Sequence, residues 1–174
     1  MTRAAAKKSA EKAAQAARNT PQARHGSGAG TSDNSGQPQS TSTEGLDGAM
    51  RALALALDKK ALEPILLDVR QLCSFCNYQL VISGRSDRQV DAIADGIELG
   101  LKQEGLRPIS SEGARSGNWA LLDYGDFVIH VFLHSAREHY DLEGLWNDAP
   151  RVPIDVPADA RIPVDEHYEP SLVQ

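Results

Sequence analysis

The sequence of 174 residues is poor in several kinds of residue, and each scarcity narrows what the protein can be. No run approaches the roughly eighteen apolar residues of a membrane-spanning helix, so we expect no membrane partner. The first eighteen residues lack the apolar core of a secretion signal, although their alanines and basic residues resemble a transit peptide. We therefore expect a cytoplasmic protein, with organellar import as the less favoured alternative.

Cysteine is almost absent. Cys73 and Cys76 form one Cys-x-x-Cys pair, and no second pair or suitably spaced histidine completes a zinc site. Such a pair is redox-active in some proteins. Two thiols that flank Phe75 are better explained as small buried hydrophobic residues. The sequence thus predicts no metal site.

Residues with large apolar side chains are scarce at both ends of the chain. Residues 1–45 contain alanine, basic residues and then a Gly/Ser/Thr/Gln/Asn run, so we expect a disordered basic tail. Residues 150–174 are rich in proline and acidic residues, and we expect a flexible extension there. Residues 46–149 remain as one domain with enough apolar residues for a modest core.

Charge divides along the same boundary. Residues 1–45 hold six Lys and Arg against three Asp and Glu, whereas residues 46–174 hold twelve against twenty-one. An acidic domain argues against nucleic-acid binding that depends mainly on neutralising phosphates. Its charge is compatible with a basic protein partner, and equally with solubility alone.

Hydrophobic spacing predicts alternating helices and strands. We expect a helix over 47–61 with Met50, Leu53, Ala54, Leu57 and Ala61 on one face, and strands over 65–69 and 78–83, separated by a turn or short helix. Ser86 and Gln89 form a capping box that opens a helix. Its apolar stripe comprises Val90, Ile93, Ala94, Ile97 and Leu101. Gly105 ends this helix.

The second half of the domain predicts a hairpin and a closing helix. We expect a brief edge strand over 106–109, a loop over 110–118, and hairpin strands over 119–123 and 127–133. A second capping box, Ser135 to Glu138, would open a helix that continues to Trp146. The element order predicts a single α/β (α+β) domain with one mixed sheet flanked by helices.

Residues 119–146 concentrate the large rings, with both tryptophans and three of the five histidines. Rings build cores and also anchor interfaces. Period-two alternation places His130, Phe132 and His134 on one strand face, so His130 is expected to be hydrogen-bonded or half-exposed rather than a catalytic base. Arg137, Tyr140, Glu143 and Trp146 would form one helical stripe, suited equally to an interface and to packing on the sheet.

One arrangement suggests an enzyme. A Gly-Ser turn that precedes a helix, ending at Ser86, could bind an anion. With Asp123 and Asp126 as magnesium ligands, it would resemble a nucleotidyltransferase or nucleotide-binding site. The two acids bracket a tight hairpin turn, however, so they would not converge on one metal.

The sequence resembles the ribosomal silencing factor (Iojap) family in five blocks that occur in the family's order. These blocks are Leu80-Val-Ile-Ser-Gly-Arg-Ser-Asp-Arg-Gln-Val90, Glu112-Gly113, Trp119-Ala-Leu-Leu-Asp-Tyr-Gly-Asp126, His130-Val-Phe132 and Arg137-Glu-His-Tyr140 with Leu142-Glu-Gly-Leu-Trp146. The resemblance runs from about Ala49 to Asp148. Asn77 and Gln79 depart from the family pattern, which weakens any binding role for that strand edge.

The resemblance implies a translation repressor rather than an enzyme, with a nucleotidyltransferase-like fold, an incomplete catalytic site and no cofactor. It implies binding to the large ribosomal subunit through ribosomal protein L-fourteen, which blocks joining of the small subunit under nutrient limitation in the bacterial cytoplasm. We expect a monomer or weak homodimer. The expected partner surface, or its immediate support, comprises Trp119, Asp123, His130, Arg137, Tyr140, Leu142, Glu143 and Trp146.

A third class of function rests on the tail. Its basic residues could contact ribosomal RNA at the periphery of the interface, or could make the protein a nucleic-acid adaptor. These residues are Lys7, Lys8, Lys12, Arg18 and Arg24.

Overall fold

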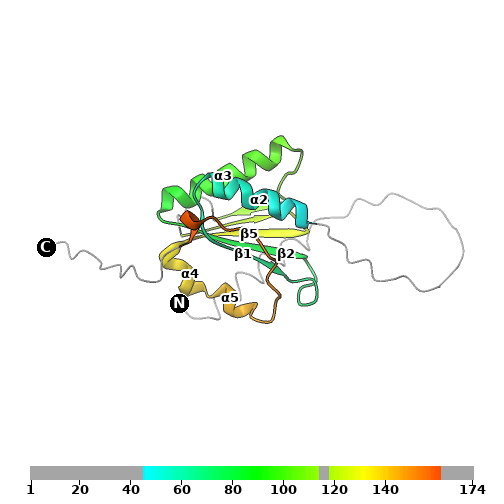
Figure 1. Cartoon of the computed structure of the whole chain (residues 1–174). Helices are drawn as coiled ribbons and strands as arrows, with labels where there is room; N and C mark the ends of the chain where they lie inside the picture. Colours follow the sequence, from blue (N-terminus) through cyan, green and yellow to red (C-terminus); the bar gives the residue numbers. More distant parts are fainter. Residues whose placement is uncertain (1–44, 114–117, 162–174) are drawn as a thin grey trace, which may run out of the picture.

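A five-stranded sheet separates two layers of helices in the computed structural model, which describes residues 45–113 and 118–161 (Figure 1). The strands lie in the order β1 (Leu62–Asp68), β2 (Tyr78–Gly84), β5 (Phe127–Leu133), β4 (Trp119–Asp123) and β3 (Ser110–Glu112). The long helices α2 (Leu46–Asp58) and α3 (Asp87–Gln103) cover one face, and the short helices α4 (His134–Tyr140) and α5 (Leu142–Leu145) lie beneath the other.

The sheet is mixed, as the sequence predicted. β2 and β5 pair in parallel at its centre, and the other neighbouring strands pair antiparallel. The predicted hairpin is confirmed in β4 and β5, and the predicted strand 78–83 in β2. No helix within the described ranges is long and apolar enough to cross a membrane.

Helix α3 confirms its predicted face, since its buried residues are Val90, Ile93, Ala94, Ile97 and Leu101. Ser86 caps it, with Oγ accepting from the backbone N–H of Gln89 at 3.3 Å. The Gln89 side chain accepts from the N–H of Arg85 and donates to the carbonyls of Lys59 and Lys60. One residue therefore ties the start of α3 to the connection between α2 and β1.

The Ser86 cap can be tested by a matched pair of substitutions. We expect Ser86→Ala to lower the free energy of unfolding by about 1 kcal/mol, because an amide at the start of α3 loses its acceptor. Ser135→Ala is the control, since α4 begins at His134 and has no side-chain cap. Its effect should stay within about 0.5 kcal/mol. Urea unfolding followed by circular dichroism measures both, and equal losses would contradict the assignment.

Helix α2 ends at Asp58 rather than at residue 61, and its buried face was predicted only in part, since Leu53 is buried and Leu57 packs on the core. Met50 is 38% exposed and Ala54 is exposed, whereas the buried residues are Ala49, Ala52, Leu53 and Ala56. Alanines let the helix lie close to the sheet. A Cβ added at Gly48 would lie 2.5 Å from the Phe127 ring. The close approach of helix and sheet, not the sum of apolar side chains, selects this face.

One further prediction fails at a sheet edge, and one for a connection is confirmed. The edge strand is β3 at Ser110–Glu112 rather than 106–109, so it occupies part of the segment predicted to be a loop. The connection between β1 and β2 is a turn, which is one of the two forms predicted for it. Residues 114–117 of the predicted loop lie outside the described residues, as do residues 1–44 of the predicted tail and residues 162–174.

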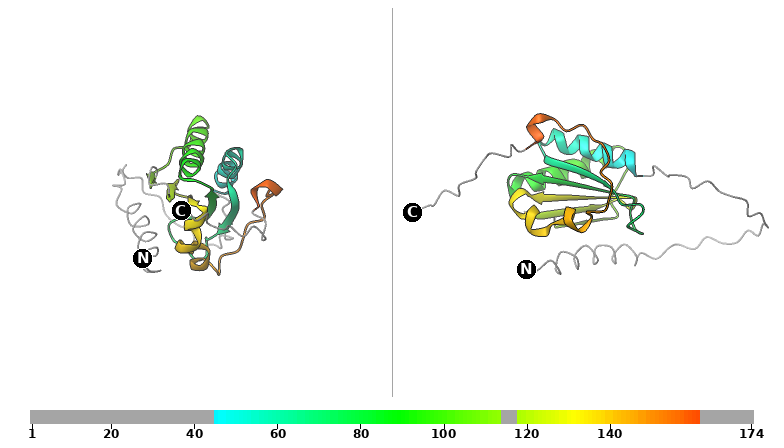
Figure 2. Two further views of the ribbon diagram at one scale, coloured as in Figure 1. Left: turned by 90° about the vertical axis from the view of Figure 1, so that its left-hand side faces the viewer. Right: turned by 60° about the horizontal axis from the view of Figure 1, so that its bottom comes forward.

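Residues 150–161 pack on the domain, contrary to the flexible extension predicted from residue 150 (Figure 2). The N–H of Asp68 donates to the Pro150 carbonyl at 2.8 Å, and the N–H of Val152 donates to the Leu66 carbonyl at 2.8 Å. The segment thus forms an isolated antiparallel bridge, between Arg151 and Leu67, along β1. Residue 149 is therefore not the limit of the packed domain.

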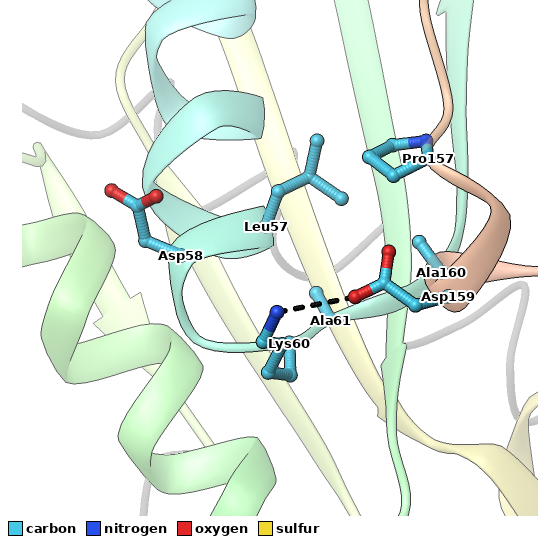
Figure 3. A pocket seen from close by; sticks show the side chains of 7 residues that line it. All are labelled: Leu57, Asp58, Lys60, Ala61, Pro157, Asp159 and Ala160. Atoms are coloured by element: carbon cyan, nitrogen blue, oxygen red, sulfur yellow. Dashed lines mark hydrogen bonds and ion pairs between the residues drawn. The ribbon is translucent and has the colours of Figure 1, made fainter.

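The segment ends against the carboxyl end of α2. Its helix η1 (Ala158–Ala160) lines a hollow of about 200 Å³ with the last turn of α2 (Figure 3). Lys60 Nζ donates to Asp159 Oδ2 at 3.1 Å across it, and this contact lowers the pKa of Asp159. Both side chains are largely exposed, so the ion pair locates the segment but contributes little free energy.

Candidate partner-binding surface

Five rings gather on the sheet face away from α2 and α3. We call Trp119, His130, Phe132, Tyr140 and Trp146 the ring cluster. Trp119 and Phe132 are direct cross-strand partners on β4 and β5, and His130 lies two residues along β5 on the same face. The sequence alternation of the hairpin therefore produces the cluster.

Stacking orders the cluster. The Trp119 ring lies nearly parallel to those of Phe132 and His130, with centroids 5.5 and 5.9 Å apart. Tyr140 reaches back from the end of α4 and tilts onto Trp119 at 5.3 Å and Phe132 at 5.4 Å. These separations lie in the range of favourable aromatic pairs. The half-exposed rings are thus held on a rigid base.

Three members of the ring cluster reach solvent. Trp119, Tyr140 and Trp146 are half-buried, and the neighbouring Leu145 on α5 is 44% exposed. The adjoining segment 138–148 has no Lys or Arg and carries four acidic residues, Glu138, Asp141, Glu143 and Asp148. Partly exposed rings with a charged rim are the usual composition of a protein interface.

Arg137 supports this surface from inside. It is 6% exposed, and its Nη1 donates to Ser83 Oγ at 2.9 Å and to the Glu63 carbonyl at 2.7 Å. Its Nε donates to Glu143 Oε1 at 2.7 Å. Glu63 has a left-handed φ of 45° at an irregularity of β1. One guanidinium thus fastens α4 and α5 to β1 and β2.

The predicted single helix from Ser135 to Trp146 is two helices. Asp141 adopts a left-handed φ of 44° between α4 and α5, and its Oδ1 accepts from the N–H of Gly144. The second capping box is therefore wrong, and the actual cap is Asp141. The predicted continuous helical stripe is interrupted as well, since the helix breaks at Asp141, and Glu143 accepts from Arg137 across this break.

His130 lies in the interior, not half-exposed as predicted. It is 3% exposed, and its Nδ1 has no hydrogen-bond partner among the described residues. Burial lowers the pKa of His130 to about 3, because charging the ring would remove a cation from water without compensation. His134 does not continue its strand face, since it begins α4.

The residues of the enzyme alternative lie apart. Ser86 follows the end of β2 beside Leu133, whereas Asp123 pairs with Val128 at the opposite end of β5. Five residues of strand separate these positions by about 16 Å. Asp123 is buried, and its Oδ1 accepts from the Gly125 N–H at 2.8 Å within the hairpin turn. The described ranges contain no group of three or more His, Cys, Asp or Glu side chains that could hold a metal ion.

The eight predicted partner-surface residues divide into two sets. The half-buried ones that can touch a partner are Trp119, Tyr140, Glu143 and Trp146. The buried ones that can only support them are Asp123, His130, Arg137 and Leu142. Sequence reasoning missed Phe132 as the base of the stack and Leu145 as an exposed apolar neighbour. The period-two spacing that places Phe132 on the same strand face as His130 could have identified Phe132.

The described residues form a mixed α/β domain whose distinguishing surface feature is a set of half-exposed rings beside an acidic rim. A family model described as "Ribosomal silencing factor during starvation" matches residues 42–171, and the chain belongs to this family. The match extends beyond the resemblance found in the sequence, because it includes the segment after residue 150.

Individual proteins of this family are also similar to the chain in sequence. The chain is 43% identical over 89 residues to the ribosomal silencing factor RsfS of Chromobacterium violaceum, covering 51% of this chain and 73% of that protein. It is 39% identical over 107 residues to RsfS of Bacillus subtilis, covering 61% and 91%. It is 32% identical over 132 residues to the chloroplastic protein Iojap of Zea mays, covering 72% and 56%.

A solved structure has the same fold. The crystal structure of a Chromobacterium violaceum protein superposes with a TM-score of 0.58 at 36% identity, covering 65% of this chain and 93% of that one. The predicted fold class is therefore confirmed.

Proposed function

We propose that this protein represses translation in the cytoplasm by binding the large ribosomal subunit and sterically blocking the small subunit. Ribosomal protein L-fourteen is the proposed attachment point, and no chemical step is required. Family membership supports a role in ribosome silencing. The observation that carries the binding mode is the half-exposed ring cluster beside an acidic rim.

Charge supports a basic partner. Residues 46–174 carry nine more acidic than basic residues, and the segment 138–148 beside the rings is wholly acidic among its charged side chains. A basic ribosomal protein would be attracted to this field before contact. The rings would then supply most of the affinity, since aromatic anchors dominate interface energies.

Tyr140→Ala should weaken binding to purified large subunits about 5- to 150-fold, the cost of truncating an interface anchor. Tyr140 is chosen because it is half-buried and packs on Trp119 and Phe132 without belonging to the sheet. Sedimentation of the protein with large subunits measures the affinity. Small subunits added to large subunits that carry the wild-type protein should form fewer joined ribosomes than small subunits added to large subunits alone.

Leu99→Ala is the matched control. Leu99 is 58% exposed on α3, in the helical layer on the other side of the sheet. Its truncation should leave binding unchanged. Loss of binding in the Leu99 variant with normal binding in a folded Tyr140 variant would move the interface to the helical face. Unimpaired subunit joining at saturating protein would reject the steric mechanism.

A further inference from the structure

The connection between β1 and β2 holds Cys73 and Cys76 side by side. Their Sγ atoms are 3.7 Å apart, and no disulfide joins them. The backbone fixes this arrangement, because the N–H of Val69 donates to the Asn77 carbonyl at 2.9 Å across the base of the loop. The N–H of Cys73 donates to the Val69 carbonyl at 2.7 Å. The two sulfurs therefore meet in the folded loop without any rearrangement of the sheet.

The two thiols have unequal surroundings. Cys73 is half-buried, whereas Cys76 is 4% exposed with Gln79 Nε2 at 3.7 Å from its sulfur. The hydrogen bond with Cys73, and then burial, raise the pKa of Cys76. Cys76 accordingly keeps its proton, and Cys73 is the sulfur that an external reagent meets first.

The pair is not part of a metal site within the described ranges, where no set of three suitable ligands exists. It packs instead into an apolar cluster that also includes Trp119 and Trp146 of the ring cluster. The two cysteines and two of the three half-exposed rings therefore pack in the same cluster.

We propose that Cys73 and Cys76 are a redox-active pair whose reversible disulfide weakens binding at the ring cluster. The disulfide itself is independent of the proposed function, whereas its effect on binding rests on that function. A bond between residues three apart closes a very short loop, so it constrains the unfolded chain little. Its role is therefore control rather than stabilisation.

The oxidant we name is a low-molecular-weight disulfide such as glutathione disulfide. The Cys73 thiolate attacks one of its sulfurs, the glutathione S–S bond breaks, and one glutathione leaves and takes up a proton. Once Cys73 is in the mixed disulfide, its thiol no longer raises the pKa of Cys76. Cys76 then gives its proton to water and attacks the Cys73 sulfur, and the second glutathione leaves as a thiolate and is protonated. Two protein thiols are oxidised by two electrons, and one glutathione disulfide is reduced to two thiols.

Intact-mass spectrometry of the full-length protein in glutathione disulfide tests the chemistry. The wild type should lose two hydrogens and retain no glutathione, and dithiothreitol should reverse the change. Cys76→Ser should stall as a glutathione adduct on Cys73. Cys73→Ser should form an adduct at least about tenfold more slowly, because Cys76 is buried. Cys76→Ala should also stop at the glutathione adduct on Cys73, and it does so without burying a hydroxyl group.

Three results would contradict the proposal that Cys73 and Cys76 form a redox-active pair. These are a persistent wild-type adduct, no reaction in the folded wild type, and equal reactivity of the two serine variants when circular dichroism shows both to be folded. Tryptophan fluorescence gives a second readout, since both tryptophans of the chain pack in the affected cluster. The spectrum should change on oxidation and recover on reduction.

Sedimentation with large subunits tests the control of binding. The oxidised wild type should bind about fivefold or more weakly than the reduced form, as when one interface side chain is displaced. The Cys73→Ala variant should bind large subunits equally in buffer with glutathione disulfide and in buffer with dithiothreitol. A disulfide with unchanged affinity would reject the control of binding. Absence of binding by either form would reject the proposed function and leave the mass result standing.

Discussion

His130→Phe should make the protein more resistant to acid. Between pH 7 and pH 5 the wild type should lose about 2 kcal/mol more folding free energy than the variant. Phenylalanine keeps a flat ring beside Trp119 and Phe132, where His130 stacks in the native protein. The variant lacks only the proton-binding nitrogens. Urea unfolding at several pH values measures the difference.

Stability falls as the pH falls because the His130 ring is buried. The pKa of His130 is lowered to about 3 in the folded protein, whereas an unfolded histidine has a pKa of about 6.5. The unfolded chain therefore binds a proton first as the pH falls, and stability is lost from about pH 6.5 down to about pH 3. At pH 5 the loss depends almost wholly on the unfolded value.

His139→Phe is the control for this pH dependence, because His139 is exposed on α4. It should follow the wild type between pH 7 and pH 5. Parallel pH curves for the wild type and the His130 variant would contradict the buried neutral ring and imply that water reaches it.

Arg137→Met should cost about 3 kcal/mol of folding free energy. Methionine fills much of the same volume but leaves Ser83, the Glu63 carbonyl and the Glu143 carboxylate without their donor. Because Arg137 fastens α4 and α5 to the sheet, the same variant should also loosen the ring cluster. Chemical unfolding measures the stability loss, and tryptophan fluorescence of the folded state reports the loosening.

Arg51→Met is the matched control. Arg51 also pairs with a glutamate, Glu104, but the two side chains are 48% and 40% exposed. An exposed pair contributes at most about 1 kcal/mol. If both methionine variants lost the same stability, the contacts of Arg137 would be no more important than a surface ion pair.

Local patterns predicted the elements whose two sides differ in polarity. Helix α3 has one apolar stripe, so spacing identified its buried face, while Ser86 and Gly105 marked its limits. Helix α2 is apolar on more than one side. Spacing found the helix but could not select the face, because the close approach of Gly48 to Phe127 depends on the assembled sheet.

Long-range contacts account for what the sequence did not predict at the site. Arg137 resembles a surface residue on a short helix, but its partners Glu63 and Ser83 lie 74 and 54 residues earlier. The sequence showed that large rings concentrate in residues 119–146, but it did not predict their stacking on Phe132. The positions of Tyr140 and Trp146 depend on the helix break at Asp141, and nothing in helical spacing marked that residue as left-handed.

The hydrogen bonds of residues 150–152 to β1 have a consequence for the newly made chain. They cover the end of edge strand β1 from Leu66 to Asp68, and the other edge is the three-residue strand β3. An uncovered edge strand is a template for aggregation, and short edges are poor templates. Until residues 150–152 leave the ribosome that synthesises them, β1 is the one long edge among the described strands that another chain could pair with.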